Sequence, residues 1–185
     1  LRVVNSDDVF EKYLKDAGLS LKMPPEEWDE NQKQRKRAKK VTATRQANYI
    51  AGRIGMVIDG TGKEYDKIRE QKANLEALGY DCHMIFVNTS VEVALERNEK
   101  RERTVPEDVA ILSWKAVQGN IGKFSQLFKG TMVIVDNNKP DQNIEVMTFK
   151  EVKRLLKKKV RNTRAKQWIE MEMKNRGIKR KPKGF

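Results

Sequence analysis

Short apolar runs alternate with longer segments of helical periodicity along this chain. Each run is apolar throughout or nearly so, with Arg2 and His83 as exceptions, and is followed at once by Asn or Asp, which is typical of a strand buried on both faces. The intervening segments repeat apolar residues every three to four positions and therefore predict amphipathic helices. The predicted strands are Leu1–Val4, Met56–Ile58, Cys82–Val87 and Met132–Val135.

Capping residues indicate where the helices begin. Ser6 is suited to cap the first helix. Thr89 with Glu92, and Thr148 with Glu151, have the spacing of a capping box. The predicted helices cover residues 7–17, 32–51 and 64–78, a segment from Thr89 into the run 97–106, residues 106–128, and a last helix from about Thr148.

Strands and helices that alternate in this way predict an α/β fold, a three-layer α/β/α arrangement around a parallel sheet. Ligands of such sheets bind at the carboxyl ends of the strands. Polar residues follow every predicted strand, so we expect the binding site at these ends. They are Asn5–Asp8, Asp59–Gly62, Asn88 and Asp136–Asn138.

Acidic residues at two of these ends suit the chemistry of phosphoryl transfer. Asp7 and Asp8 lie where a strand meets a helix, and a carboxylate there can deprotonate a substrate hydroxyl. Asp59 can hold Mg²⁺, and Thr61 offers a hydroxyl to a substrate. The alternatives are an N-terminal helix charge for the Asp pair and a plain turn after Asp59.

Arginines gather in the run from Arg97 to Pro106. Arg97 and Arg101 are four residues apart, on one face of the predicted helix, and Arg103 follows. Guanidinium groups can each hold two phosphate oxygens and can neutralise charge during phosphoryl transfer. The alternative is a solvated helix face on which neighbouring glutamates pair with the arginines.

The net charge of +13 over 185 residues comes almost entirely from one end of the chain. Residues 150–185 hold 15 basic and 3 acidic residues, a net charge of +12, whereas 1–149 are nearly neutral. Such a segment predicts sequence-independent contact with nucleic acid. An anionic membrane surface and a solvated helix are the alternatives. Residues 177–185 are expected to form a disordered basic end.

Cys82 and His83 show no metal-ligand spacing, and one cysteine forms no internal disulfide. We expect both to be ordinary strand residues. No apolar run approaches the ~18 residues of a membrane span. With no visible signal peptide, we expect a cytoplasmic protein.

The order and spacing of Asn5–Asp8, Asp59–Gly62 and the run 97–106 resemble P-loop kinases of the zeta-toxin and polynucleotide-kinase type over about residues 1–138. The resemblance implies a P-loop NTPase kinase-like fold, ATP and Mg²⁺ as cofactors, and a hydroxyl-bearing substrate. It also implies roles for single residues. Asp7 would be the general base, Asp8 a neighbouring substrate or structural residue, and Asp59 the acid near Mg²⁺; Arg97 and Arg101, with Arg103, would grip the ATP phosphates, and Asn137 and Asn138 would lie near the adenine.

Two departures from the family pattern change the expectation. Phe10 stands where polynucleotide kinases carry an Arg, which argues against a 5′-hydroxyl nucleic-acid substrate. The G-x-x-x-x-G-K-[ST] loop is absent from the sequence. We therefore expect the chain to be the C-terminal part of a kinase. The missing part would be roughly 30 residues, which is the usual length of a strand–loop–helix unit. We expect the chain to be catalytically inactive by itself. The strands containing Val57 and Ile85 would then lack the strand between them.

The predicted organisation is a kinase-like domain over 1–147, with a helical substrate-side insertion at 19–54 and a lid at 97–106, followed by a basic helix and tail at 148–185. The predicted activity is transfer of the ATP γ-phosphoryl group to a hydroxyl of a sugar nucleotide, a nucleoside or a nucleic-acid end. The competing prediction is a non-catalytic nucleic-acid-binding protein on the same fold, acting through its basic segment.

Overall fold

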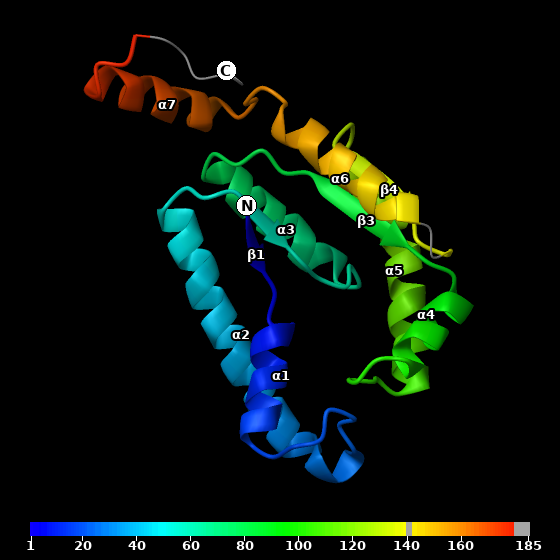
Figure 1. Cartoon of the computed structure of the whole chain (residues 1–185). Helices are drawn as coiled ribbons and strands as arrows, with labels where there is room; N and C mark the ends of the chain where they lie inside the picture. Colours follow the sequence, from blue (N-terminus) through cyan, green and yellow to red (C-terminus); the bar gives the residue numbers. More distant parts are fainter. Residues whose placement is uncertain (140–141, 180–185) are drawn as a thin grey trace. The chain divides into compact units, whose positions relative to one another are not determined.

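The computed structural model describes residues 1–139 and 142–179, so most of the expected basic end, 180–185, lies outside the described residues. Figure 1 shows short strands among longer helices. In chain order the elements are β1 (Arg2–Val4), α1 (Asp7–Asp16), the 3₁₀ helix η1 (Pro25–Glu27), α2 (Trp28–Ala51), β2 (Met56–Ile58), α3 (Tyr65–Ala77), β3 (Met84–Asn88), α4 (Val91–Glu99), α5 (Glu107–Leu127), β4 (Met132–Asp136), α6 (Gln142–Leu156) and α7 (Thr163–Asn175).

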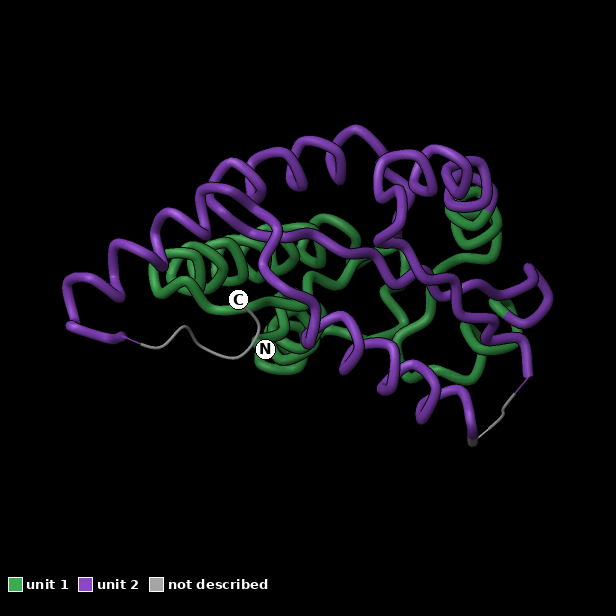
Figure 2. Tube along the Cα trace, turned by 90° about the horizontal axis from the view of Figure 1, so that it is seen from above, with its two compact units in different colours: residues 1–61, 94–114 green, residues 62–93, 115–185 purple. Residues whose placement is uncertain are grey.

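The chain forms two compact units, which Figure 2 colours separately. The first unit contains residues 1–61 and 94–114, and the second contains 62–93 and 115–185. Of the three divisions between them, one follows Thr61 in the loop between β2 and α3, and the other two fall inside α4 and α5. Each unit has a parallel strand pair and a hydrophobic core of its own.

In the first unit, β1 and β2 pair in parallel, with Val4 opposite Ile58. Helices α1 and α2 pack side by side (Figure 1), because apolar residues recur on one face of α1. Phe10 and Leu14 are fully buried there against Ala38 of α2. This packing fixes the start of α1 beside the ends of the two strands.

In the second unit, β3 and β4 pair in parallel, with Phe86 opposite Ile134. Phe86 packs on Phe124 of α5 and on Phe128, which follows that helix. Val87 and Val135 belong to the opposite face of the pair, which α6 partly covers.

The prediction of parallel strands is confirmed. Among the described residues, β2 pairs only with β1 and β3 only with β4, so the strands containing Val57 and Ile85 do not pair with each other. In that same part of the chain, no helix has the length and apolar character needed to cross a membrane.

Several predicted helix limits were wrong. Ser6 makes no capping bond through its side chain. At α4, the Ser90 Oγ accepts a hydrogen bond from the Val93 N–H, so the side chain one residue after Thr89 caps this helix. Helix α6 begins at Gln142, several residues before the predicted start at Thr148. Ile144 and Thr148 are one helical turn apart, and both line the same pocket, so the turn before Thr148 already packs as part of the helix. The basic segment then forms two helices, α6 and α7, with a turn between them.

The third predicted strand begins later than expected, at Met84, so Cys82 and His83 precede it. Helix α4 ends at Glu99, and Arg101 therefore does not share a helical face with Arg97. The sequence pattern missed the end of α4 because charged residues with good helix propensity continue through the run 97–106.

Candidate functional site

The ends of β1 and β2 are joined to the start of α1 by one side chain, Asn5. Its amide nitrogen donates a hydrogen bond to the Asp59 carboxylate at 2.8 Å. Its amide oxygen accepts a hydrogen bond from the Asp7 backbone N–H, also at 2.8 Å. The latter bond satisfies a donor at the helix start, so Asn5 takes the capping role expected of Ser6. Asp59 and Asp7 are thereby tied to the same amide group.

Arg103 reaches the same helix start from the loop after α4. Its guanidinium lies 3.0 Å from an Asp7 carboxylate oxygen and 3.4 Å from one of Glu11. It also lies over the Phe10 ring, 5.8 Å from the ring centroid. The Arg103 side chain is only 16% exposed, whereas Asp7 is 47% exposed. Asp7 therefore has one oxygen held by Arg103 while much of its carboxyl group faces solvent.

The loop that carries Arg103 is closed by Asn98. The Asn98 amide donates to the Val105 carbonyl at 2.7 Å and accepts from the Val105 N–H at 3.0 Å. Lys22 donates to the Arg101 carbonyl at 3.2 Å. These bonds shape the loop so that Arg103 turns toward α1 while the Arg101 side chain remains exposed.

The structure thus brings three of the predicted site residues together: Asp7, Asp59 and Arg103. Asp8 and Thr61 are exposed, and Arg97 is half-buried on α4. The pKa of Glu96 is lowered first by its hydrogen bond with Lys100 and to a lesser extent by Arg97. Lys100 of this run forms an ion pair with Glu96, and both side chains are largely exposed.

Sequence reasoning gave no role to Glu11 or Asn98 and did not foresee the bridge made by Asn5. Glu11 lies one helical turn after Asp7, so the i, i+4 spacing was a usable signal. The pairing of Asn98 with the Val105 backbone depends on how the loop closes, and no sequence pattern indicates it.

Asp59 is the residue here suited to Mg²⁺. Magnesium sites need only one or two protein carboxylates when phosphates and water supply the other ligands. Asp59 is exposed and is oriented by Asn5, which fits that arrangement. In residues 1–139 and 142–179, no cluster of three His, Cys, Asp or Glu side chains could hold a metal by itself.

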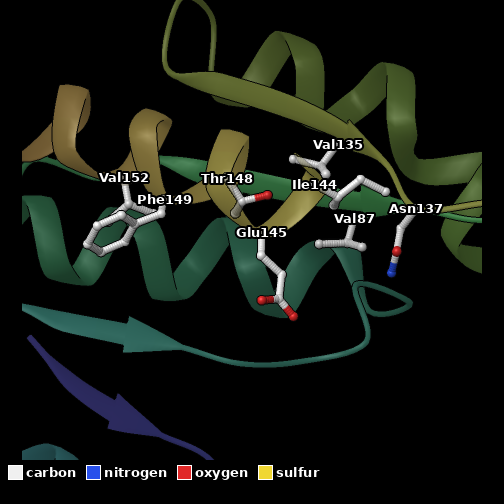
Figure 3. A pocket seen from close by; sticks show the side chains of 8 residues that line it. All are labelled: Val87, Val135, Asn137, Ile144, Glu145, Thr148, Phe149 and Val152. Carbon is white, nitrogen blue, oxygen red and sulfur yellow. The ribbon is translucent and has the colours of Figure 1, made fainter. Parts of the chain in front are cut away.

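The second unit has a pocket of about 480 Å³ between α6 and one face of the β3–β4 pair (Figure 3). Val87 and Val135 form its strand side, and Asn137 and Glu145 supply polar groups. The residues on its α6 side are Ile144, Glu145, Thr148, Phe149 and Val152.

The two predicted cofactor residues beside this pocket differ in their surroundings. Asn137 lines it, and its backbone N–H donates to the Asn88 carbonyl at 2.8 Å. Asn138 instead accepts a hydrogen bond from the Ser90 N–H and donates one to Asp136, each at 2.5 Å. Asn138 thus joins the end of β4 to the start of α4.

Cys82 and His83 precede β3 in the same unit. Burial raises the pKa of the Cys82 thiol to about 11. Burial also lowers the pKa of His83, and the positive charges of Lys158, Arg161 and Arg154 lower it further, whereas Asp81 opposes them. A thiol of this kind is a poor nucleophile at neutral pH.

The family model described as Zeta toxin matches residues 8–163. The chain belongs to the zeta toxin family. This family is P-loop kinase-like, and zeta toxin kinases generally use ATP and Mg²⁺. The zeta toxin match includes Asp59, the arginine run and both asparagines after β4, and it begins one residue after Asp7. No curated protein and no solved structure matches the chain.

Proposed function

We propose that the protein is an ATP-dependent phosphotransferase in which Asp7 is the general base. The observation that carries this proposal is the joint placement of Asp7, Asp59 and Arg103 at the ends of β1 and β2. Family membership supports the use of ATP. The acceptor is a hydroxyl group of a sugar nucleotide, a nucleoside or a nucleic-acid end.

Asp7 can accept a proton because part of its carboxylate is free. Arg103 holds one oxygen at 3.0 Å and so fixes the rotation of the carboxyl group. The substrate hydroxyl gives its proton to Asp7, and the hydroxyl oxygen attacks the γ-phosphorus of ATP. The bond from that phosphorus to the β-phosphate oxygen breaks and ADP leaves. Arg103 is in this proposal a positioning residue.

Asp59 and the remaining arginines would help to balance the negative charge of the ATP phosphates. Asp59 would hold Mg²⁺, whose chemistry when bound is to neutralise the transferring phosphoryl group. Arg97 and Arg101 would contact ATP phosphates, and the exposure of Arg101 leaves its guanidinium available for that contact. Asp8 and Thr61, both exposed, would contact the acceptor.

For the second unit taken by itself, we propose that the pocket beside α6 accepts an adenine base. Its volume of about 480 Å³ suits a small organic ligand. Phe149 offers an exposed aromatic ring and Asn137 an amide, which match the stacking surface and hydrogen-bonding edge of adenine. Asn138 would act indirectly, by fixing the end of β4.

The test is substitution of Asp7 by Asn in the protein expressed from its full coding sequence. Transfer of radiolabelled γ-phosphate to the acceptor classes named above should fall by about 10²–10⁴-fold. The matched control is Asp16→Asn, the same change at the exposed far end of α1, where the side chain pairs with Lys12. Undiminished transfer by Asp7→Asn would show that Asp7 is not the base.

A second candidate function is nucleic-acid binding through residues 150–185. The charge of this segment favours it: its net charge is +12, while the rest of the chain is nearly neutral.

A further inference from the structure

Basic side chains crowd the turn that joins α6 to α7. Between Lys150 and Lys166 the chain has nine basic residues and one acidic residue, Glu151. We call this region the α6–α7 basic surface. Its members are Lys150, Lys153, Arg154, Lys157, Lys158, Lys159, Arg161, Arg164 and Lys166.

The turn is fixed to the fold by hydrogen bonds with the last turn of α3 and with the segment between α3 and β3. The Asn162 amide donates to the carbonyls of Glu76 and Tyr80, at 2.7 and 3.2 Å. The Arg161 backbone N–H donates to the Asp81 carboxylate at 2.7 Å. The same Asn162 side chain accepts from backbone N–H groups at the start of α7 and so caps this helix. The basic residues are therefore presented on an ordered turn.

Close packing at Gly79 supports this order. A Cβ atom at Gly79 would lie 3.4 Å from the Ala165 backbone nitrogen, and the residue has a φ of +107°. The Arg164 guanidinium also donates to the Ala77 carbonyl at 2.7 Å. The first turn of α7 thus packs directly against the end of α3.

Among the described residues, carboxylates neutralise few of these charges. Arg154 pairs with Glu151 at 2.6 Å, and Lys153 lies over the Phe149 ring. Across residues 1–139 and 142–179, no carboxylate forms an ion pair with Lys157, Lys158 or Lys159. Uncompensated like charges held close together favour binding of a polyanion.

We propose that the α6–α7 basic surface binds the phosphate backbone of a nucleic acid without sequence preference. Charge complementarity favours a nucleic acid as the ligand. The positively charged side chains on the two helices and the turn are ordered, and they can pair with successive phosphates of its backbone. A membrane-binding helix needs in addition a continuous exposed apolar face. Within residues 150–166, which the structure describes throughout, Leu156 is the one large apolar side chain that is exposed. Val146, Met147 and Phe149 are exposed on the part of α6 that precedes this surface, and Met171 and Ile178 are exposed beyond it.

This inference names the surface for the second candidate function, and it contains none of the proposed catalytic residues. Binding should weaken steeply with salt, because each lysine that contacts a phosphate releases counterions. Two unrelated sequences of equal length should bind alike.

The test is fluorescence anisotropy with labelled 20-nucleotide single-stranded DNAs of two sequences, with no ATP present. In the variant Lys157→Gln/Lys158→Gln/Lys159→Gln, affinity should fall about tenfold or more, and the slope of log K against log salt should fall by about 2. The matched control is Lys36→Gln/Lys39→Gln/Lys40→Gln on α2, which removes the same charge from exposed positions. This control should stay within about twofold of the parent.

An equal loss in both triple variants, or no loss in either, would overturn the proposal. A second arm uses vesicles of phosphatidylserine and phosphatidylcholine under the same salt. Binding of vesicles without binding of DNA would also overturn it, in favour of a membrane surface. Asp7→Asn should leave DNA affinity unchanged, so failure of the phosphotransferase proposal and failure of this one are distinguishable.

Discussion

The side-chain amide of Asn5 connects the ends of β1 and β2 to the start of α1. Its nitrogen holds Asp59 and its oxygen holds the backbone of Asp7. Sequence alone identified both aspartates as site candidates, because acids after buried strands form a readable pattern. It did not identify the connection, since the Asn5–Asp59 bond joins residues that only strand pairing brings together.

Arg103 illustrates the same limit. The arginine run was visible in the sequence, and guanidinium groups there predicted contact with anions. Which arginine turns toward α1 depends on the closure of the loop by Asn98, a contact of side chain with backbone. Spacing along a presumed helix favoured Arg97 and Arg101, and the helix ends before Arg101.

His83 should titrate below its ordinary pKa, and it is the only histidine of the chain. Because the folded-state pKa is depressed, the unfolded protein binds the proton more readily. The contribution of His83 to folding free energy is thus fully present above about pH 6.5 and is lost as the pH falls below it. NMR titration of its Cε1–H resonance should show the low pKa directly.

Lys158→Gln should raise the pKa of His83 toward 6.5, because it removes a nearby positive charge. Added salt should act in the same direction. The control is Lys39→Gln in the first unit, which should leave the resonance unshifted at every pH. A His83 pKa at or above 6.5 in the parent protein would contradict the prediction.

At the scale of elements, α7 depends on its cap. Asn162→Ala removes the side chain that caps α7 and donates to the Glu76 carbonyl in the last turn of α3 and to the Tyr80 carbonyl after it. We expect the substitution to destabilise α7 by about 1–2 kcal/mol. Backbone amides in residues 163–175 should then exchange with deuterium faster, as measured by mass spectrometry.

Asn175→Ala, at the exposed end of the same helix, is the control and should change exchange little. Equal acceleration by both substitutions would mean that the turn is not held by Asn162. The cap is hard to find in the sequence, because the basic residues on both sides of it suit one continuous helix.

Elements with a strong apolar period were predicted most accurately. The strand Met56–Ile58 has the predicted limits, and α5 extends over nearly the whole predicted segment. The start of α6 was missed by several residues, because Thr148 with Glu151 imitates a capping box inside the helix. Capping residues do not locate a helix start where the same surface residue is equally suited to the cap and to a position inside the helix.

At the scale of the whole molecule, each unit has its own hydrophobic core. Leu14 is fully buried in the first core and Phe124 in the second. Leu14→Ala should cost about 2–5 kcal/mol and Phe124→Ala about 3–5 kcal/mol. Hydrogen exchange should accelerate in α1 and α2 for the first substitution, and in α3 and β3 for the second.

If Leu14→Ala accelerated exchange in α3 and β3 as much as in α1, the two cores would unfold as one cooperative unit. Sequence reasoning predicted that the strands run parallel and that polar residues follow them, but it did not predict which strands pair. The division into 1–61 with 94–114, and 62–93 with 115–185, was not predicted, because it depends on contacts between distant segments.

The interleaved division also constrains synthesis of the protein. Arg103 and Asn98 belong to the first unit but are translated after residues 62–93. The Asp7–Arg103 ion pair therefore forms only once the ribosome has released the chain well beyond α4, and until then the start of α1 lacks its cation. No single cut of the gene can separate the two units, since each consists of two segments interrupted by the other.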